Sequence, residues 1–540
     1  MTSDAKIFTN GTILTMDEAN SVVEAVGVVG ALIYAVGTID DVRAAMPTTR
    51  EEIDLNGKTM IPAFIDPHGH FPDSGFVSEL RANLASPPNG VCTNLDDVFK
   101  QLKLKADETP SGEWVMGASY DDTSIQEGRL PTRDELDVVS DIHPIWVIHS
   151  SGHSGVANSM ALSIQKIDEN TPDPLGGIYF RDDNGRLNGQ MNGVSAMGEM
   201  ADTHFLINQE RFILGFNAAC KEYLSYGVTL AQNAWTALPL LEMFADVVTK
   251  GDPGIDIILL PVSEIEPDFS NIGLGMNWPD ETYISLGPRK LLTDGSFLMR
   301  TAYLTEPYHT GAEGVKPDFG LPYIEREVLF NEVKKLHDMG HQIHTHCNGD
   351  AAADMFFDAV ENALATNSRA DHRHTLIHGQ VMRREQLDRA AGLGITISFF
   401  SAHIYYWGDK HYSDFLGPDR AQNISPAAWA EEANVRYTLH NDASVTPTRP
   451  MHLMHCAVHR KTSLGRILGP DQRISVTSAL RAHTIDAAWQ VFKEKDRGSI
   501  ELNKIADLIV LDANPHENSD ILEQIKVEQT WRRGVCVYKA

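Results

Sequence analysis

The chain has little cysteine: five residues among 540, odd in number, widely spaced and never in a Cys-x-x-Cys pair. Disulfide frameworks and thiolate zinc sites both need paired or clustered cysteines, so neither is expected. The five thiols are predicted to be reduced and unpaired, as in a cytoplasmic protein.

Long apolar runs are missing as well. No stretch approaches the roughly 20 apolar residues that a membrane span needs. The first residues, Met-Thr-Ser-Asp-Ala-Lys-Ile-Phe, lack the charged lead and apolar core of an export signal. With 42% hydrophobic and 22% charged residues, the composition is ordinary for a soluble enzyme. We expect a soluble, cytoplasmic protein.

Positive charge is in short supply. Lys and Arg number 45 against 74 Asp and Glu, which gives a formal net charge of −29. Such a chain repels phosphate backbones and anionic lipid surfaces, so neither nucleic acid nor a membrane is expected as a partner. A small-molecule substrate is expected instead. Exposed edge strands would allow a homodimer, but the sequence does not specify the oligomeric state.

The two ends of the chain share one texture. Residues 6–60 hold short Val- and Ile-rich runs separated by Gly and Asp, and residues 506–512 and 527–538 repeat this pattern. Such runs are typical of antiparallel strands. We therefore predict a small β-sandwich assembled from residues 1–60 and 490–540.

Between the two ends, apolar strands alternate with amphipathic helices. Alternation of this kind predicts parallel strands with helical crossovers, and eight such units describe a TIM-like (β/α)8 barrel over residues 61–489. About 150 residues separate the first strand, before His70, from the second, near Gly227, far more than one crossover requires. An inserted lobe at 75–215 is predicted to cover the barrel mouth.

Polar residues close several of the short hydrophobic runs. His68 and His70 lie two apart after one run, and side chains at i and i+2 of a strand share a face. This pair alone is a weak signal, but four more polar residues end other runs: Lys290, His346, His378 and Asp442. A barrel gathers the carboxyl ends of its strands at its active face, so these six side chains are expected to converge.

The chemistry of these six residues favours divalent ions. Imidazole and carboxylate ligands suit zinc, with manganese, iron or cobalt possible. A lysine ammonium cannot bind a cation. If Lys290 is deprotonated it can react with carbon dioxide to form a carbamate, whose two oxygens can bridge two ions. The alternative is an ordinary lysine that binds a substrate carboxylate beside a single ion.

Six motifs carry a family resemblance. They are Ile-Pro-Ala-Phe-Ile-Asp-Pro-His-Gly-His, Arg-Lys-Leu-Leu-Thr-Asp-Gly-Ser, His-Cys-Asn-Gly-Asp-Ala-Ala-Ala-Asp, Leu-Ile-His-Gly, His-Asn-Asp-Ala and Lys-Ile-Ala-Asp-Leu-Ile-Val-Leu-Asp. Spanning residues 60–512, they resemble the amidohydrolase superfamily, in the branch that contains N-substituted formamide deformylase. The resemblance implies a (β/α)8 fold and a pair of divalent ions, most plausibly zinc.

The resemblance also assigns roles. It implies that His68, His70 and Asp442 hold one ion, that His346 and His378 hold the other, and that a carbamylated Lys290 bridges them. It further implies that the ions would activate water for attack on the substrate carbonyl, and that Asp442 would take the proton and pass it to the leaving nitrogen.

The implied reaction is hydrolysis of a non-peptide carbon–nitrogen bond, in an N-formyl or N-acyl amide with an apolar or aromatic nitrogen substituent. A deaminase is one alternative, although deaminases of this superfamily usually keep one ion and need no bridging lysine. A carbamate, urea or ester hydrolase also stays open. A non-catalytic scaffold is disfavoured because all six ligand positions are filled.

Substrate contacts are predicted at two places. Tyr405, Tyr406 and Trp407 leave a strand at the catalytic face and would form an apolar wall, the alternative being a hydrophobic plug under the next helix. His440 lies two residues before Asp442 and is expected on the same side.

His153 and Asn158 lie in a segment similar to one that caps the pocket in this branch, and are expected to line it. In place of the His-Ala-Ile-Gly-Asp found in many relatives, the chain has Cys347 after His346. We predict that this thiol is buried and inert.

Overall fold

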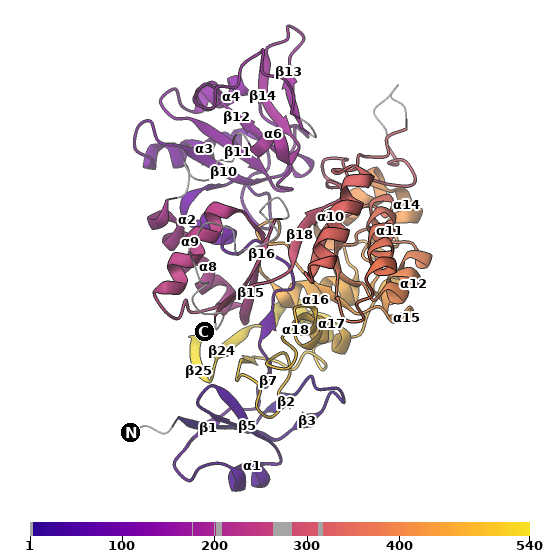
Figure 1. Cartoon of the computed structure of the whole chain (residues 1–540). Coiled ribbons are helices and arrows are strands. Elements are labelled where there is room, and N and C mark those ends of the chain that lie inside the picture. Colours follow the sequence, from indigo (N-terminus) through magenta and orange to yellow (C-terminus); the bar gives the residue numbers. More distant parts are fainter. Residues whose placement is uncertain (1–3, 175–176, 199, 201–207, 263–282, 311–316) are drawn as a thin grey trace.

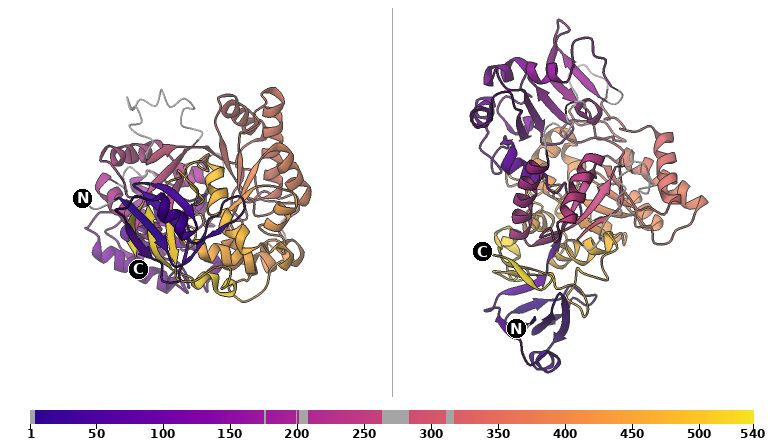
Figure 2. Two further views of the ribbon diagram at one scale, coloured as in Figure 1. Left: turned by 90° about the horizontal axis from the view of Figure 1, so that it is seen from below. Right: turned by 60° about the vertical axis from the view of Figure 1, so that its left-hand side comes forward.

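The computed structural model describes residues 4–174, 177–198, 200, 208–262, 283–310 and 317–540. Three tiers are stacked along the long axis of the molecule in Figure 1 and in the right-hand view of Figure 2. A lobe of sheet and helices forms one end, a region of parallel strands and helices lies in the middle, and small sheets that include both chain ends form the other end.

Strands from the two chain ends share one sheet. Its six strands run in the spatial order β25-β24-β23-β7-β2-β3, beside a four-stranded sheet in the order β5-β4-β1-β6. Phe8, Met60, Leu508 and Trp531 belong to one buried cluster that draws on both sheets. The elements are β1 (Ala5–Thr9), β2 (Thr12–Leu14), β3 (Val22–Val23), β4 (Ala25–Val29), β5 (Leu32–Gly37), α1 (Ile39–Ala45), β6 (Glu51–Asp54), β7 (Thr59–Pro62), β23 (Leu508–Leu511), β24 (Val527–Arg532) and β25 (Val535–Lys539).

Parallel strands fill the middle tier. β8, β15, β16 and β17 form one sheet and β18 to β22 another, and a parallel bridge between Val262 and Lys290 links them. If β17 and β18 are counted as one interrupted strand, the described residues supply eight parallel strands in chain order. Their bounds are β8 (Phe64–Ile65), β15 (Val228–Thr236), β16 (Asp256–Pro261), β17 (Ile284–Leu286), β18 (Arg289–Leu292), β19 (Ile343–Cys347), β20 (Thr375–His378), β21 (Thr396–Phe399) and β22 (Tyr437–Leu439).

Helices follow these strands and pack apolar faces against them. In α11, for example, Ala352, Phe356, Val360 and Ala363 recur at helical spacing and are fully buried. The helices of this tier are α8 (Gln209–Ser225), α9 (Leu238–Thr249), α10 (Arg326–Asp338), α11 (Asp350–Thr366), α12 (Arg384–Leu393), α13 (Ala402–Lys410), α14 (Gly417–Ala421), α15 (Ala427–Glu432), α16 (Pro450–His459), α17 (Val476–Ala482) and α18 (Ile485–Gln490). None of the helices in the described part of the chain combines the length and apolar character that crossing a membrane requires.

The lobe lies between β8 and β15 in the sequence. Its sheet has the order β13-β14-β12-β11-β10-β9 and its own buried clusters, with Val115, Val147 and Trp146 fully buried. Its elements are α2 (Asp73–Leu80), β9 (Ala82–Asn83), α3 (Leu95–Glu108), β10 (Val115–Tyr120), α4 (Arg133–Val139), β11 (Ile145–His149), β12 (Ser154–Ala157), α5 (Ser159–Ile164), β13 (Ile178–Arg181), β14 (Leu187–Asn192) and α6 (Val194–Gly198). The glycines Gly75 and Gly215 let α2 and α8 approach so closely that a Cβ on Gly75 would collide with the Gly215 carbonyl.

A buried charge cluster joins the parallel strands to the terminal sheets. Asp256, the first residue of β16, accepts hydrogen bonds at 2.5 Å from both Arg497 and Arg532 and at 3.0 Å from Arg533. Burial alone would raise the pKa of Asp256, but the three guanidinium groups hold it below its ordinary value. The carboxylate is therefore the common counter-ion of three arginines.

Replacing Asp256 by Asn should lower the free energy of unfolding by about 3–5 kcal/mol, because it removes the buried negative charge that three arginines share and leaves only Asp507 beside Arg497 and Asp252 beside Arg532. Urea unfolding followed by circular dichroism measures this. Asp252→Asn is the matched control, because Asp252 also pairs with Arg532 but its side chain is 46% exposed; its loss should stay under about 1 kcal/mol. Equal losses in the two variants would contradict the assigned role of Asp256.

Candidate metal centre

The six predicted ligand residues come together on the parallel strands or on the segments that leave them. His68 and His70 follow β8, Lys290 lies in β18, His346 in β19, His378 ends β20 and Asp442 follows β22. Five of the six are buried, whereas the side chain of His70 is 34% exposed. The loops after the first and last strands meet, since the His70 amide donates to the Ala443 carbonyl at 2.7 Å.

One group of donor atoms surrounds Asp442. Its Oδ1 lies 3.1 Å from His70 Nε2 and 3.5 Å from His68 Nε2, and His68 Nε2 is 3.3 Å from Lys290 Nζ. Ligand atoms of His68, His378 and Asp442 all lie within 4.8 Å of one another. Such spacing lets one cation reach all three.

A second pair of donors lies beside this group. His346 Nδ1 and His378 Nε2 are 3.0 Å apart. The other nitrogen of His346, Nε2, is 3.0 Å from the Gly295 carbonyl oxygen. It is also 3.2 Å from the amide nitrogen of Asn348, which donates to Gly295 at 2.8 Å. The carbonyl calls for a proton on Nε2 and the amide for a lone pair, so these contacts fit either tautomer of His346.

The electrostatics of the site fit cation binding. Burial lowers the pKa values of His68, His346 and His378 well below the ordinary value, so these imidazoles are neutral at neutral pH. Burial would raise the pKa of Asp442, but the hydrogen bond and charge of His70 outweigh it and hold the carboxyl ionised. Neutral imidazole and carboxylate are the protonation states that bind metals.

Lys290 is the unusual member of the group. Among the described residues, no carboxylate lies within salt-bridge distance of it, and burial lowers its pKa to about 7. A large fraction is therefore the neutral amine at neutral pH. Only the neutral amine can react with carbon dioxide.

Two of the strand-end residues have left-handed backbones. The φ angles are 78° at His378 and 52° at Asp442. Residues with side chains adopt this region rarely and at a cost, which is met most often at functional sites. The backbone here turns the two side chains toward the common centre.

A second carboxylate and histidine cluster lies in the lobe, formed by Asp121, Asp122 and His149. The Asp121 oxygens already accept hydrogen bonds from Ser124, Trp407 and Thr123. With its oxygens taken, Asp121 has no need of a cation. We therefore assign no ion to this cluster.

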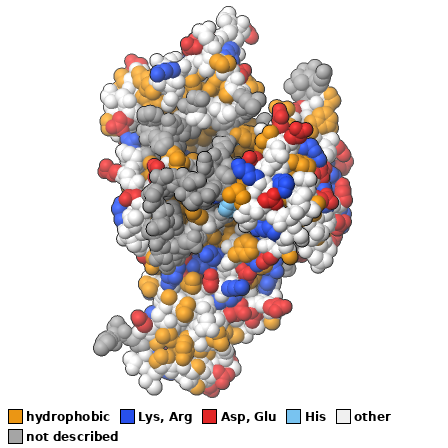
Figure 3. All heavy atoms as spheres, viewed as in Figure 1, with side chains coloured by type: hydrophobic (Ala, Val, Ile, Leu, Met, Phe, Trp, Pro, Cys, Tyr) orange, Lys and Arg blue, Asp and Glu red, His pale blue; other side chains and the backbone are white. Residues whose placement is uncertain are grey.

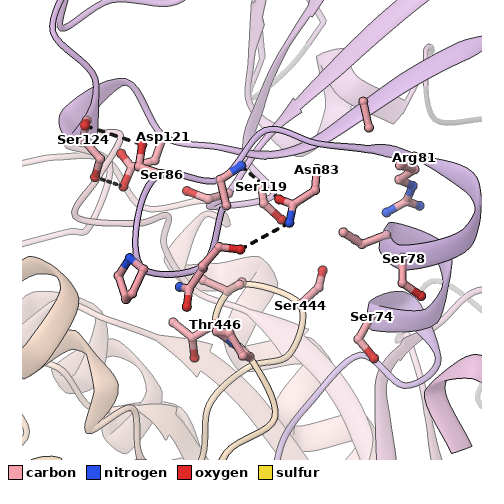
Figure 4. A pocket seen from close by; sticks show the side chains of 18 of the residues that line it. Ser74, Ser78, Arg81, Asn83, Ser86, Ser119, Asp121, Ser124, Ser444 and Thr446 are labelled. Atoms are coloured by element: carbon pink, nitrogen blue, oxygen red, sulfur yellow. Dashed lines mark hydrogen bonds between the residues drawn. The ribbon is translucent and has the colours of Figure 1, made fainter. Parts of the chain in front are cut away.

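A cavity of about 760 Å³ lies between the lobe and the loop that follows Asp442. Figure 4 shows its lining: Ser74 and Ser78 on α2 and Arg81 directly after it, Asn83, Ser119 and Asp121 from the lobe, and Ser444 and Thr446 from the loop. Hydroxyl and amide groups dominate, beside Tyr406 and Trp407. None of the six candidate ligands is among the described residues that line it.

The predicted substrate contacts divide into two groups. The ring of His153 lies 5.3 Å from that of His346, so the lobe reaches the centre as expected. Tyr406 and Trp407 line the cavity and form hydrogen bonds to the lobe. Tyr406 donates to Asn89 at 3.2 Å and Trp407 to Asp121 at 2.9 Å.

The other three predicted contacts are placed elsewhere. Tyr405 packs its ring against His452 and is not part of the cavity lining. Asn158 is buried as the N-cap of α5, where its side chain accepts from the Ala161 and Ile145 amides. His440 is fully buried behind His378 and bonds to it and to Ser398. None of the three is among the described residues that line the cavity, and their substrate contacts stay predictions.

One further residue near the centre was not predicted from the sequence. Asp294, within the quoted Thr-Asp-Gly motif, accepts the backbone amides of Asn348, Gly349 and Tyr303 and lies 3.8 Å from His346 Nε2. Burial raises its pKa to about 7. It fixes the turn that follows His346.

Comparison with known proteins places the chain in a class. A family model described as "Amidohydrolase family" matches residues 51–538, so the chain belongs to the amidohydrolase family. It is an enzyme that acts on carbon–nitrogen bonds. The resemblance inferred from the six motifs is thereby confirmed.

Particular relatives match nearly end to end. The chain is 28% identical to the N-substituted formamide deformylase of Arthrobacter pascens, covering 98% of this chain and 97% of that one. It is 27% identical to the Arabidopsis thaliana protein LONG AFTER FAR-RED 3, covering 94% and 87%. The crystal structure of an uncharacterized metal-dependent hydrolase from Pyrococcus horikoshii superposes with a TM-score of 0.75 at 23% identity, over 95% and 98% of the two chains. This confirms the predicted α/β fold class.

Zinc added to chelator-treated protein should stabilise it against unfolding. At a free zinc concentration 100 times the Kd, the free energy of unfolding should rise by about 2.7 kcal/mol, as linkage requires of a ligand that binds only the folded state. Thermal unfolding with and without zinc measures the gain. His346→Asn should remove most of it, whereas His372→Asn, a buried histidine bonded to the Leu393 carbonyl, should keep it. No gain in the wild-type protein would contradict a metal centre.

Proposed function

We propose that the chain is a metal-dependent hydrolase of a non-peptide carbon–nitrogen bond, with an N-formyl or N-acyl amide as substrate. The convergence of four histidines, one lysine and one aspartate at the ends of parallel strands is the observation that supports this most. The residues are His68, His70, His346, His378, Lys290 and Asp442. In the amidohydrolase family this chemistry is hydrolytic, and the deformylase relative points to the amide.

The donor groups divide naturally into two ion sites. His68 and His70 both face Asp442 Oδ1, which supports one ion held by these three residues. The facing nitrogens of His346 and His378 support a second. A carbamate on Lys290 would carry two oxygens from the side of His68 and could bridge the ions. Zinc fits the donors best, with manganese, iron or cobalt as alternatives.

Bound divalent ions would polarise the amide carbonyl and lower the pKa of water toward neutrality. The residues of the chain supply the proton movements. Asp442 is held ionised next to His70, so it can accept a proton from the attacking water and return it to the leaving nitrogen. His153 approaches from the lobe at the ring of His346, where it can contact the substrate and exclude water.

Similarity to the formamide deformylase supports an apolar or aromatic nitrogen substituent. Tyr406 and Trp407 provide aromatic surface for such a group in the cavity beside the centre. The remaining lining is rich in hydroxyl groups, so a substituent with polar atoms would fit it as well.

The wider organisation stays a proposal of the same kind. We propose a (β/α)8 barrel over residues 61–489, a terminal β-sandwich from 1–60 and 490–540, and a covering lobe at 75–215. A small-molecule substrate, a cytoplasmic location and a homodimer are expected with them. Figure 3 shows apolar side chains gathered on the tier of the chain ends, and Val535 on the edge strand β25 is 61% exposed. That edge is a candidate pairing surface.

Replacing Lys290 should show whether the site holds two ions or one. Lys290→Ala is expected to lower the metal content from about two ions per chain to one, and short carboxylates should restore part of the activity because they can replace the carbamate. Elemental analysis and activity assays measure these effects. Lys290→Arg is the control that keeps a cation but cannot form a carbamate. If either variant kept two ions and full activity, the bridging role would be excluded.

Carbamate formation should depend on pH with a defined sign. A lysine with a pKa of about 7 is a neutral, reactive amine above that pH and an unreactive ammonium below it. Metal-free protein incubated with ¹³C-bicarbonate and zinc should therefore give a carbamate ¹³C signal that falls as the pH drops below about 7. The signal should be absent in Lys290→Ala. A signal that grows toward acid pH would contradict the assignment.

Asp442 should be required for turnover. Asp442→Asn removes the proton acceptor and should reduce kcat by about 10²–10⁴-fold. The assay follows amine release from N-formyl and N-acetyl arylamines, tested against carbamates, ureas and aminopurines. Asp122→Asn, in the lobe cluster, should stay within about twofold of wild type, because no ion is assigned there. Ammonia release from aminopurines with a single bound ion would favour a deaminase instead.

A further inference from the structure

A chain of hydrogen bonds leads from His378 to Gln490, whose side-chain orientation is fixed. Gln490 Nε2 lies 3.3 Å from the Pro67 carbonyl oxygen, and Gln490 Oε1 lies 3.0 Å from Thr438 Oγ1. A carbonyl accepts only, so the amide nitrogen must face Pro67 and the amide oxygen must face Thr438. The orientation of Gln490 is thereby set.

The next bonds lead from Gln490 to His440. Thr438 Oγ1 lies 3.0 Å from Gln490 Oε1 and donates to Ser398 Oγ at 2.8 Å. Ser398 Oγ in turn lies 2.8 Å from His440 Nδ1, where a hydroxyl can accept or donate.

These bonds reach His378, because His440 Nε2 lies 3.0 Å from His378 Nδ1. To bind an ion through Nε2, His378 must carry its proton on Nδ1 and donate it to His440 Nε2, which leaves the proton of His440 on Nδ1, facing Ser398. Ser398, Thr438, His440 and Gln490 are all fully buried, so bulk water cannot replace any of these partners.

The consequence appears at the contact between His378 and His346. His378 Nε2 lies 3.0 Å from His346 Nδ1. With the proton of His346 on Nε2, beside the Gly295 carbonyl, the two facing nitrogens both present lone pairs, and a cation relieves their repulsion. The partner behind His378 therefore prepares its Nε2 as a metal donor.

We propose that His440 is a positioning residue that fixes the tautomer and ring orientation of His378, through Ser398, Thr438 and Gln490, so that His378 Nε2 is ready to bind a divalent ion. This inference rests on the proposed metal-dependent function and names a part of it that the six ligands do not include. Partners that hold the second nitrogen of a ligating histidine typically contribute 10–100-fold in metal affinity.

Three variants test the role. His440→Leu removes the acceptor for His378 and should weaken zinc binding by about 10–100-fold. His440→Gln places an amide oxygen near the position of Nε2 and should recover most of that loss. Ser398→Ala keeps the imidazole but frees its Nδ1, so its loss should be smaller than that of His440→Leu. Competition with a chromophoric chelator measures the zinc Kd, and the absorption spectrum with cobalt reports the ligand geometry.

His374→Gln is the matched control. His374 precedes the same strand, β20, at its opposite end and also pairs with an imidazole, since its Nε2 lies 2.9 Å from His337 Nδ1. The zinc affinity of the His374→Gln variant should equal that of the wild type. At saturating zinc, His440→Gln should keep the wild-type KM, because His440 is fully buried and is not among the described residues that line the cavity.

Histidine ¹⁵N spectra of the zinc-free wild-type protein test the proton order directly, even where a variant does not fold. A proton on His378 Nδ1 supports the proposal, and a proton on His378 Nε2 overturns it. Wild-type zinc affinity in folded His440→Leu would also overturn it. Failure of the wild-type protein to bind any divalent ion would refute the proposed function instead, and the ¹⁵N spectrum would still decide the proton order.

Discussion

The structure depends on one constraint. Side chains that can bind metals are buried together without enough protons or counter-charges to satisfy one another. Lys290 has no carboxylate at salt-bridge distance among the described residues, and Asp442 is a buried carboxylate whose nearest partners are imidazoles. Isolated buried charges cost several kcal/mol each. The proposed pair of divalent ions bridged by a carbamate would remove both costs together, because it would supply positive charge to Asp442 and convert Lys290 into an anionic ligand.

The remaining architecture serves to hold these donors in place. Parallel strands bring residues from distant parts of the sequence to one level, and their hydrogen-bonded ladders allow little movement. The Asp256 cluster ties the base of β16 to the terminal sheets. From the other side, the lobe brings His153 to the centre, and the bonds of Tyr406 and Trp407 to Asn89 and Asp121 hold it against α13. Three tiers of the chain therefore meet around one small group of atoms.

The sequence predicts that six polar residues converge because each ends a short apolar run, and the structure brings these residues together. The same pattern does not predict where His440 lies, and the reason is geometric. The rule that residues two apart share a face holds along a strand, but β22 ends at Leu439 and Asp442 has a left-handed φ of 52°. His440 is fully buried behind His378, where it bonds to His378 and to Ser398. For Asn158 a local signal existed, since Asn directly before a helix is a typical N-cap.

Other features had no signal in the sequence. The contact of Trp407 with Asp121 joins residues 286 positions apart, and no local pattern reports it. The orientation of Gln490 likewise depends on Pro67, at the far end of the chain. Contacts of this kind arise from the fold as a whole, so the hydrogen bonds behind His378 are visible only in the structure.

The most direct test of the central claim is a crystal structure with anomalous scattering recorded at the zinc edge. Two peaks are predicted, one among His68, His70 and Asp442 and one between His346 and His378, with density for a carbamate extending from Lys290 Nζ between them. An unmodified Lys290 with no ion near these histidines, in crystals grown with zinc, would contradict the account.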